Sequence, residues 1–188
     1  MEKFKNKYAI KSSRLEGYDY SQNGLYFVTI CTKDREELFG EIVNEKIILN
    51  DVGKVVQEEW LKTPIIRKDV FLDAWVIMPN HLHGIIEINN KPDMLSEGRD
   101  ALQCVSTGET EYKNKFGPQV NNLASIIRGF KGVVTKRSHM CDFYFHWQSK
   151  FYDHIIRNDE SLNKIREYII TNPERWERDR NNVEDVFM

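Results

Sequence analysis

Two histidines placed one residue apart are the side chains in this chain best suited to metal chemistry. His81 and His83 begin an apolar, β-branched segment, HLHGIIEI, whose composition predicts a strand. Alternate side chains of a strand share one face, so both imidazoles face the same way, about 6–7 Å apart along the chain. Both rings can then reach one metal ion, while Leu82 points into the core. Two packed or surface histidines without a metal would give the same pattern.

A phenol and an amide lie one helical turn apart near the end of the chain. Tyr168 and Asn172 stand at positions i and i+4 of the last predicted helix, so they share a face. A phenol attacks only as its anion, and its ordinary pKa is about 10, so a neighbouring cation would help to ionise it. Tyr168 could instead pack beside the helix's apolar stripe. Tyr152, next to Asp153 and His154, is a rival nucleophile.

Residues 121–157 carry six basic and two acidic side chains, a local charge of +4 in a chain whose total is −2. Aromatic residues crowd the second half of this segment, and cations with aromatic faces are what a single-strand binder uses. A solvated helix face beside a core strand is the competing interpretation. The candidate DNA-binding residues are Arg128, Lys131, Lys136, Arg137, Lys150 and Arg157.

Composition narrows the class of protein. A length of 188 residues favours one domain, and no apolar run approaches the roughly 20 residues of a membrane span. The N-terminal residues lack the apolar core of a secretory signal. Cys31, Cys104 and Cys141 form no CxxC motif, so a disulfide framework or cysteine zinc site is not expected, and a reducing compartment such as a cytoplasm fits best.

The elements that must position these side chains form a mixed order of strands and helices. That order predicts an α+β sandwich, with a largely antiparallel sheet and helices packed on one face. We expect a polar lead-in (1–23), one domain (24–180) with a long loop at about 89–119, and a tail (181–188). The expected strands are 25–32, two within 39–50, a central strand 70–78, 81–88 and 143–147; the expected helices start at 51, limited by Pro64, at 121, ending near 137, and at 158 or 159, ending at Pro173.

Several motifs together resemble a known family. The segment WVIMPNHLHGIIEI (75–88) is similar to the HUH motif of the single-tyrosine transposases: histidine, a bulky apolar residue, histidine, after a Met-Pro-Asn turn. The sequence Tyr168-Ile169-Ile170-Thr171-Asn172-Pro173 matches the family's downstream Tyr-Ile-x-x-Asn-Pro. The segments GYDYSQNGLYFVTICT, SIIRGFKGVVTKR and WQSKFYDHIIRN resemble the REP-associated tyrosine transposase branch. The likeness spans residues 12–178, except for 89–119, which matches no family motif.

This resemblance implies a ferredoxin-like fold and metal-dependent cleavage of single-stranded or hairpin DNA at palindromic repeats. His81 and His83 would be metal ligands, Asn172 would complete the site, and Tyr168 would form a 5′-phosphotyrosine. The implied cofactor is a divalent metal, Mg²⁺ or Mn²⁺, and the implied assembly is a monomer or a homodimer. Two rival functions remain: a nucleic-acid binding module without catalysis, and a metal hydrolase that activates water.

Overall fold

The computed structural model describes residue 15 and residues 17–90 and 122–176. Most of the expected lead-in, nearly all of the long loop at 89–119 and the whole expected tail lie outside these residues. Within the described part, no helix is long and apolar enough to cross a membrane.

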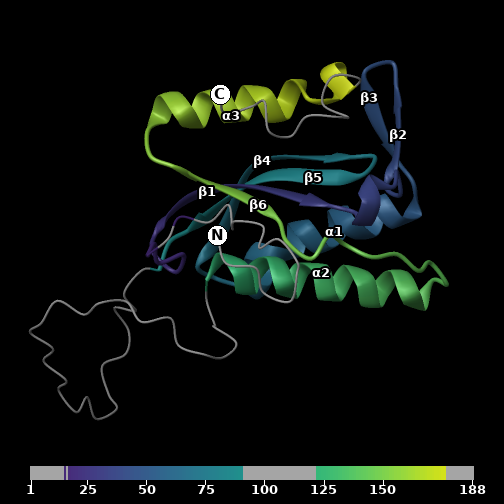
Figure 1. Ribbon diagram of the computed structural model, residues 1–188, viewed down its shortest axis with the longest axis horizontal. Coiled ribbons are helices and arrows are strands. Elements are labelled where there is room, and N and C mark those ends of the chain that lie inside the picture. Colours follow the sequence, from purple (N-terminus) through teal and green to yellow (C-terminus); the bar gives the residue numbers. More distant parts are fainter. Residues whose placement is uncertain (1–14, 16, 91–121, 177–188) are drawn as a thin grey trace, which may run out of the picture.

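A four-stranded antiparallel sheet forms the centre of the molecule (Figure 1). Its order is β4 (Val70–Met78), β5 (His81–Ile88), β1 (Gly24–Cys31) and β6 (Tyr152–Ile156). A separate hairpin pairs β2 (Gly40–Val43) with β3 (Lys46–Leu49). The central strands β5 and β1 are therefore the best shielded from water, and β5 carries the two histidines.

Three helices cover this sheet, and each begins at an asparagine. They are α1 (Asp51–Ile66), α2 (Leu123–Met140) and α3 (Asp159–Thr171), and short 3₁₀ turns η1 (Lys33–Arg35) and η2 (Pro173–Arg175) follow β1 and α3. The side chains of Asn50, Asn122 and Asn158 each accept a hydrogen bond from the backbone N–H three residues on. These bonds satisfy backbone donors that a helix leaves unpaired at its start.

The two faces of the sheet carry separate apolar cores. Trp60 of α1 and Phe130 of α2 pack with Leu82 on one face. Ile165 of α3 packs with Ile85 on the other. Because side chains alternate along β5, His81 and His83 share the face of Ile85 and lie under α3.

The predicted α+β class with a largely antiparallel sheet is confirmed, but the helices do not all lie on one face. α1 and α2 cover one face and α3 covers the opposite one (Figure 1). Likewise, the segment 70–78 is not a central strand, because β4 lies at the sheet edge. Its apolar residues on both faces are explained by the two helical layers, since α1 and α3 both contact β4.

Two predicted boundaries also differ. Helix α1 runs past Pro64 to Ile66, because a proline in the last turn removes only one late backbone bond. The segment 143–147 is not a strand; it makes a single bridge between Trp147 and Thr32. Its aromatic rings pack instead: Phe145 is buried, with its ring centroid 5.2 Å from that of Trp147. The last strand is β6, which the pattern did not predict.

A glycine in β5 permits the closest approach between α1 and the sheet. A Cβ added at Gly84 would lie 2.5 Å from Cζ2 of Trp60, and that indole is fully buried. We expect Gly84→Ala to lower the free energy of unfolding by about 1–3 kcal/mol, the usual effect of overpacking. Urea unfolding measures this change.

Gly132 in α2 is the matched control. A Cβ there meets nothing within 4 Å, and alanine has the higher helix propensity. Gly132→Ala should therefore be neutral or stabilise the protein by up to about 1 kcal/mol. Equal destabilisation by the two variants would contradict the packing argument.

Candidate active site

The two histidines of β5 meet at their outer nitrogens. His81 Nε2 and His83 Nε2 are 2.9 Å apart, and both side chains are buried, with 3% and 0% of their surface exposed. Two nitrogen lone pairs facing each other at this distance repel. This arrangement is therefore stable only with a proton between the two nitrogens or with a cation bound to both.

The inner nitrogen of each ring has its own hydrogen-bond partner. His81 Nδ1 lies 2.7 Å from Asn80 Oδ1, and His83 Nδ1 lies 2.9 Å from Thr29 Oγ1. Thr29 reaches His83 because the register places them opposite each other on β1 and β5. Inner-nitrogen partners of this kind orient imidazoles that bind metals through Nε2.

The geometry of the pair fits a divalent metal. Imidazole nitrogens bind such ions at about 2.0–2.1 Å, so two of them on adjacent octahedral positions lie about 3 Å apart. Among the described residues, no group of three or more His, Cys, Asp or Glu side chains could hold a metal. The other ligands would therefore be amide, water or substrate oxygens, which suit Mg²⁺ or Mn²⁺.

The phenol predicted as nucleophile reaches this pair. Tyr168 Oη lies 3.1 Å from His83 Nε2. Phe27 supports both rings: its centroid is 5.4 Å from that of His83, in a stacked arrangement, and 6.2 Å from that of Tyr168, edge to face. The ring of Tyr168 packs beside the apolar core of α3, which fits the packing role offered as its alternative. Its hydroxyl nevertheless lies at hydrogen-bond distance from His83.

Asn172 lies in sequence between two residues that approach the histidines. Tyr168 approaches His83, and the ring of Trp176 lies 6.0 Å from that of His81, at a tilt of 32°. Asn172 is the C-cap of α3, midway in sequence between these two residues, and only 1% of its surface is exposed. Its amide is therefore buried close in sequence to both residues.

An ion pair joins α3 to the edge strand. Arg166 donates from Nε to Asp73 Oδ1 at 2.8 Å and from Nη2 to Oδ2. Asp73 lies where the ladder between β4 and β5 is irregular, and the hydrogen bond from Arg166 holds the pKa of its carboxyl below the usual range. Because Arg166 is two residues before Tyr168, this contact helps to set how far the helix lies from the histidines.

The rival phenol, Tyr152, lies in the same layer as the histidines. Tyr152 pairs with Thr29 across β1 and β6 and therefore faces the same layer, with its ring 6.4 Å from that of Phe27. Burial, followed by the charge of Asp153, raises the pKa of Tyr152 above its usual value. A raised pKa disfavours the phenolate that a nucleophile needs.

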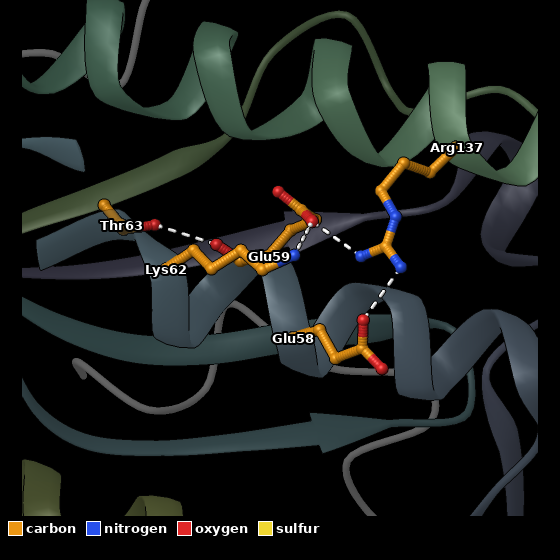
Figure 2. A network of polar contacts seen from close by, with 5 residues as sticks. All are labelled: Glu58, Glu59, Lys62, Thr63 and Arg137. Carbon is orange, nitrogen blue, oxygen red and sulfur yellow. Dashed lines mark hydrogen bonds and ion pairs between the residues drawn. The ribbon is translucent and has the colours of Figure 1, made fainter. Parts of the chain in front are cut away.

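Lys131 and Arg137, which are among the six predicted DNA-binding cations, are held by other segments of the chain. Lys131 Nζ donates to the backbone oxygens of Gln148 and Lys150, at 2.7 and 3.1 Å, and burial lowers its pKa to about 8. Figure 2 shows that Arg137 bridges α2 to Glu58 and Glu59 of α1, at 2.8 and 2.6 Å. Glu59 is almost fully buried, so this ion pair joins the two helices.

The other four predicted cations are exposed. They are Arg128, Lys136, Lys150 and Arg157. Arg128 and Lys136 lie on α2, across the sheet from the histidines (Figure 1). Lys150 and Arg157 flank β6, which is the sheet edge. The structure therefore does not gather the six residues beside the histidines.

A cavity of about 610 Å³ lies between the β2–β3 hairpin and η2. Trp176, the neighbour of His81, forms part of its wall together with Asn44, Glu45 and Arg175. Chain segments far apart in sequence build this cavity, so no local pattern could have indicated it.

Sequence reasoning missed the side chains that support the candidate ligands. Asn80 was visible as the residue before His81. Thr29 and Phe27 are found only once the register of β1 against β5 is known. Asp73 and Arg166 are 93 residues apart, and nothing in the local sequence links them.

Comparison with known proteins gives relatives along nearly the whole chain. No family model matches. An uncharacterized protein of Haemophilus influenzae is 41% identical over 174 residues, which cover 90% of this chain and 91% of that protein. A second Haemophilus influenzae protein, whose name assigns it to the REP-associated tyrosine transposases, is 24% identical over 156 residues, covering 82% of this chain and 73% of the relative.

A solved structure has the same architecture. It is a REP-associated tyrosine transposase bound to a REP hairpin, with a TM-score of 0.55, 19% sequence identity, and coverage of 94% of this chain and 78% of that one. This likeness shows the fold. The chain therefore belongs to one family with the uncharacterized Haemophilus influenzae protein, and its fold is that of the REP-associated tyrosine transposase.

Proposed function

We propose that this chain is a metal-dependent endonuclease and strand transferase for single-stranded or hairpin DNA, of the REP-associated tyrosine transposase type, with Tyr168 as its nucleophile. The observation that carries the proposal is the 3.1 Å contact between Tyr168 Oη and Nε2 of His83, a histidine whose partner nitrogen is only 2.9 Å away. The solved transposase with a similar fold is bound to a REP hairpin, which supports palindromic DNA as the substrate.

In this proposal His81, His83 and Asn172 hold one divalent cation, Mg²⁺ or Mn²⁺. Two neutral imidazoles and a neutral amide leave the charge of the ion intact, and a bound cation would polarise and orient the scissile phosphate. The site is buried under α3, where electrostatic interactions are stronger than in water.

Tyr168 supplies the covalent chemistry. Its oxygen forms a bond to phosphorus, and the bond from phosphorus to the 3′ oxygen breaks. The phenol gives its proton to solvent, and the departing 3′ oxygen takes a proton from solvent to become a hydroxyl. In the resulting 5′-phosphotyrosine, an ester bond to tyrosine replaces the ester bond to the 3′ oxygen. A 3′-hydroxyl can therefore attack this bond and join strands without a nucleotide cofactor. The Phe27 ring holds the phenol in line with the histidines.

The metal site is tested by removing both imidazoles. We expect His81→Ala/His83→Ala to lose Mn²⁺ binding and metal-dependent cleavage while still unfolding cooperatively, with a lower midpoint because two buried rings are gone. Titration of Mn²⁺ followed by electron paramagnetic resonance measures the binding. His146→Ala, which removes an exposed imidazole, is the control and should bind as the parent does. Undiminished cleavage by the double variant would reject the site.

The nucleophile is tested by removing one oxygen. Tyr168→Phe should abolish cleavage of a labelled hairpin and keep hairpin binding, and the lost hydrogen bond should cost only about 1 kcal/mol of stability. Tyr152→Phe is the matched control, since it removes the same group from the same layer, and it should remain active. A denaturing gel scores cleavage, and mass spectrometry after proteolysis locates the adduct.

The same experiment separates the rival functions. A binding module would retain the hairpin without cutting it. A hydrolase would release free ends and tolerate Tyr168→Phe. An adduct on the peptide that contains Tyr152 would assign the chemistry to the other phenol.

DNA affinity should depend on salt through the four exposed cations. If each contacts one phosphate of a single strand, log K falls with log salt at a slope of about −3. Arg128→Ala/Lys136→Ala should reduce that slope by about half, whereas Lys54→Ala, an exposed cation paired with Asp51 on α1, should leave it unchanged. Fluorescence anisotropy at several salt concentrations gives the slopes, and a slope near zero for the parent would rule out phosphate contacts by these four cations.

A further inference from the structure

Two side chains behind the histidines determine where the imidazole protons lie. We infer that Asn80 and Thr29 are positioning residues: Asn80 fixes His81 in the tautomer that can bind a cation, and Thr29 lets His83 change tautomer when a cation binds. The cation-binding half of this inference rests on the proposed metal site. The tautomers themselves belong to the protein without metal and can be tested on it alone.

The orientation of the Asn80 amide follows from its hydrogen bonds. Asn80 Nδ2 donates to the backbone oxygen of Arg35 at 3.0 Å, which turns Oδ1 toward His81 Nδ1 at 2.7 Å. The backbone oxygen of Asn80 also accepts from Thr32, from its N–H at 2.9 Å and its hydroxyl at 3.0 Å. Asn80 is therefore buried and held on several sides.

This orientation leaves His81 one tautomer. An amide oxygen only accepts hydrogen bonds, so the proton of neutral His81 must be on Nδ1. The lone pair of His81 then lies on Nε2 and faces His83, which is the state a metal ligand needs.

Thr29 imposes no such restriction on His83. Without a metal, the 2.9 Å approach to the His81 lone pair requires a proton on His83 Nε2, and the Thr29 hydroxyl then donates to Nδ1. With a cation on Nε2, the proton moves to Nδ1 and the same hydroxyl accepts. A hydroxyl satisfies both states without a change of rotamer, because it both donates and accepts. In the metal-free state the Tyr168 hydroxyl, 3.1 Å from His83 Nε2, accepts from the same Nε2 proton.

The tautomers are read by long-range ¹H–¹⁵N correlation spectra of the metal-free protein, above the ordinary imidazole pKa of about 6.5. We expect an Nδ1–H tautomer for His81 and an Nε2–H tautomer for His83. Asn80→Asp keeps the acceptor and should keep the His81 tautomer. Asn80→Asp loses the N–H that binds Arg35, and Asn80→Ala loses both this N–H and the acceptor oxygen. In Asn80→Ala, His81 should therefore carry its proton on Nε2. Since both variants lose the Arg35 contact, their difference isolates the acceptor.

Binding of Mn²⁺ alone tests the consequence. Asn80→Ala and Thr29→Val should each weaken Mn²⁺ binding by about 10–100-fold, the usual effect of losing such a partner. Thr29→Ser restores the hydroxyl and should bind close to the parent value. Thr29→Val should fold, because valine has nearly the shape of threonine.

The outcomes keep the two proposals apart. An Nε2–H tautomer of His81 in the parent, or an Asn80→Ala variant that keeps both the parent tautomer and the parent affinity, overturns the role of Asn80. Thr29→Val with parent affinity overturns the role of Thr29. A parent protein with the expected tautomers that binds no Mn²⁺ would instead reject the metal site of the proposed function.

Discussion

The structure depends on burying two imidazoles 2.9 Å apart. Such a pair is unstable in an apolar interior unless every other polar atom of the rings has a partner, because an unpaired buried polar group costs about 1–3 kcal/mol. Neighbouring strands and turns supply these partners: Thr29 from β1, and Asn80 from the turn before β5. The central strands must therefore keep their register, since a slip of one residue would turn both imidazoles toward α1 and α2.

That requirement explains why the sheet is covered on both faces. One face provides stability through the large core around Trp60 and Phe130. The other face holds a smaller core under α3, and the polar pair lies at its end. The ion pair between Arg166 and Asp73 fixes the helix to the edge strand, so that a hydroxyl on α3 meets a nitrogen on β5 at hydrogen-bond distance. The layer of α1 and α2 thus supplies most of the apolar core, and the layer of α3 sets the geometry of the site.

The sequence predicted the elements with strong periodicity and the residues that carry functional groups. Strand alternation placed His81 and His83 on one face, the family resemblance assigned the nucleophile to Tyr168, and the structure brings these three side chains together. Helical spacing placed Asn172 on the face of Tyr168, and its role as a ligand was implied by the family resemblance alone. The position of β4 at the edge was not predictable, because a strand covered on both faces looks the same at an edge as at the centre.

Other misses have the same origin in tertiary packing. The run 143–147 has strand composition, yet its rings satisfy their preference by packing with Phe39 and each other. The charge of the segment 121–157 could be counted, but its distribution could not. Whether Lys131 and Arg137 face solvent or bind carbonyl and carboxylate oxygens depends on chain segments up to 79 residues away.

The direction of β5 has a consequence for how this domain can vary in length. The histidines stand at the start of the strand, and the chain leaves it at Ile88, about 17 Å beyond His83 at roughly 3.4 Å per residue. The 34 residues between Ile88 and the start of α2 at Leu123 therefore depart from the sheet at the end remote from the paired imidazoles. A change in chain length after Ile88 therefore enters at the end of β5 remote from the imidazoles, whereas the register that fixes His81 and His83 against β1 is set before it.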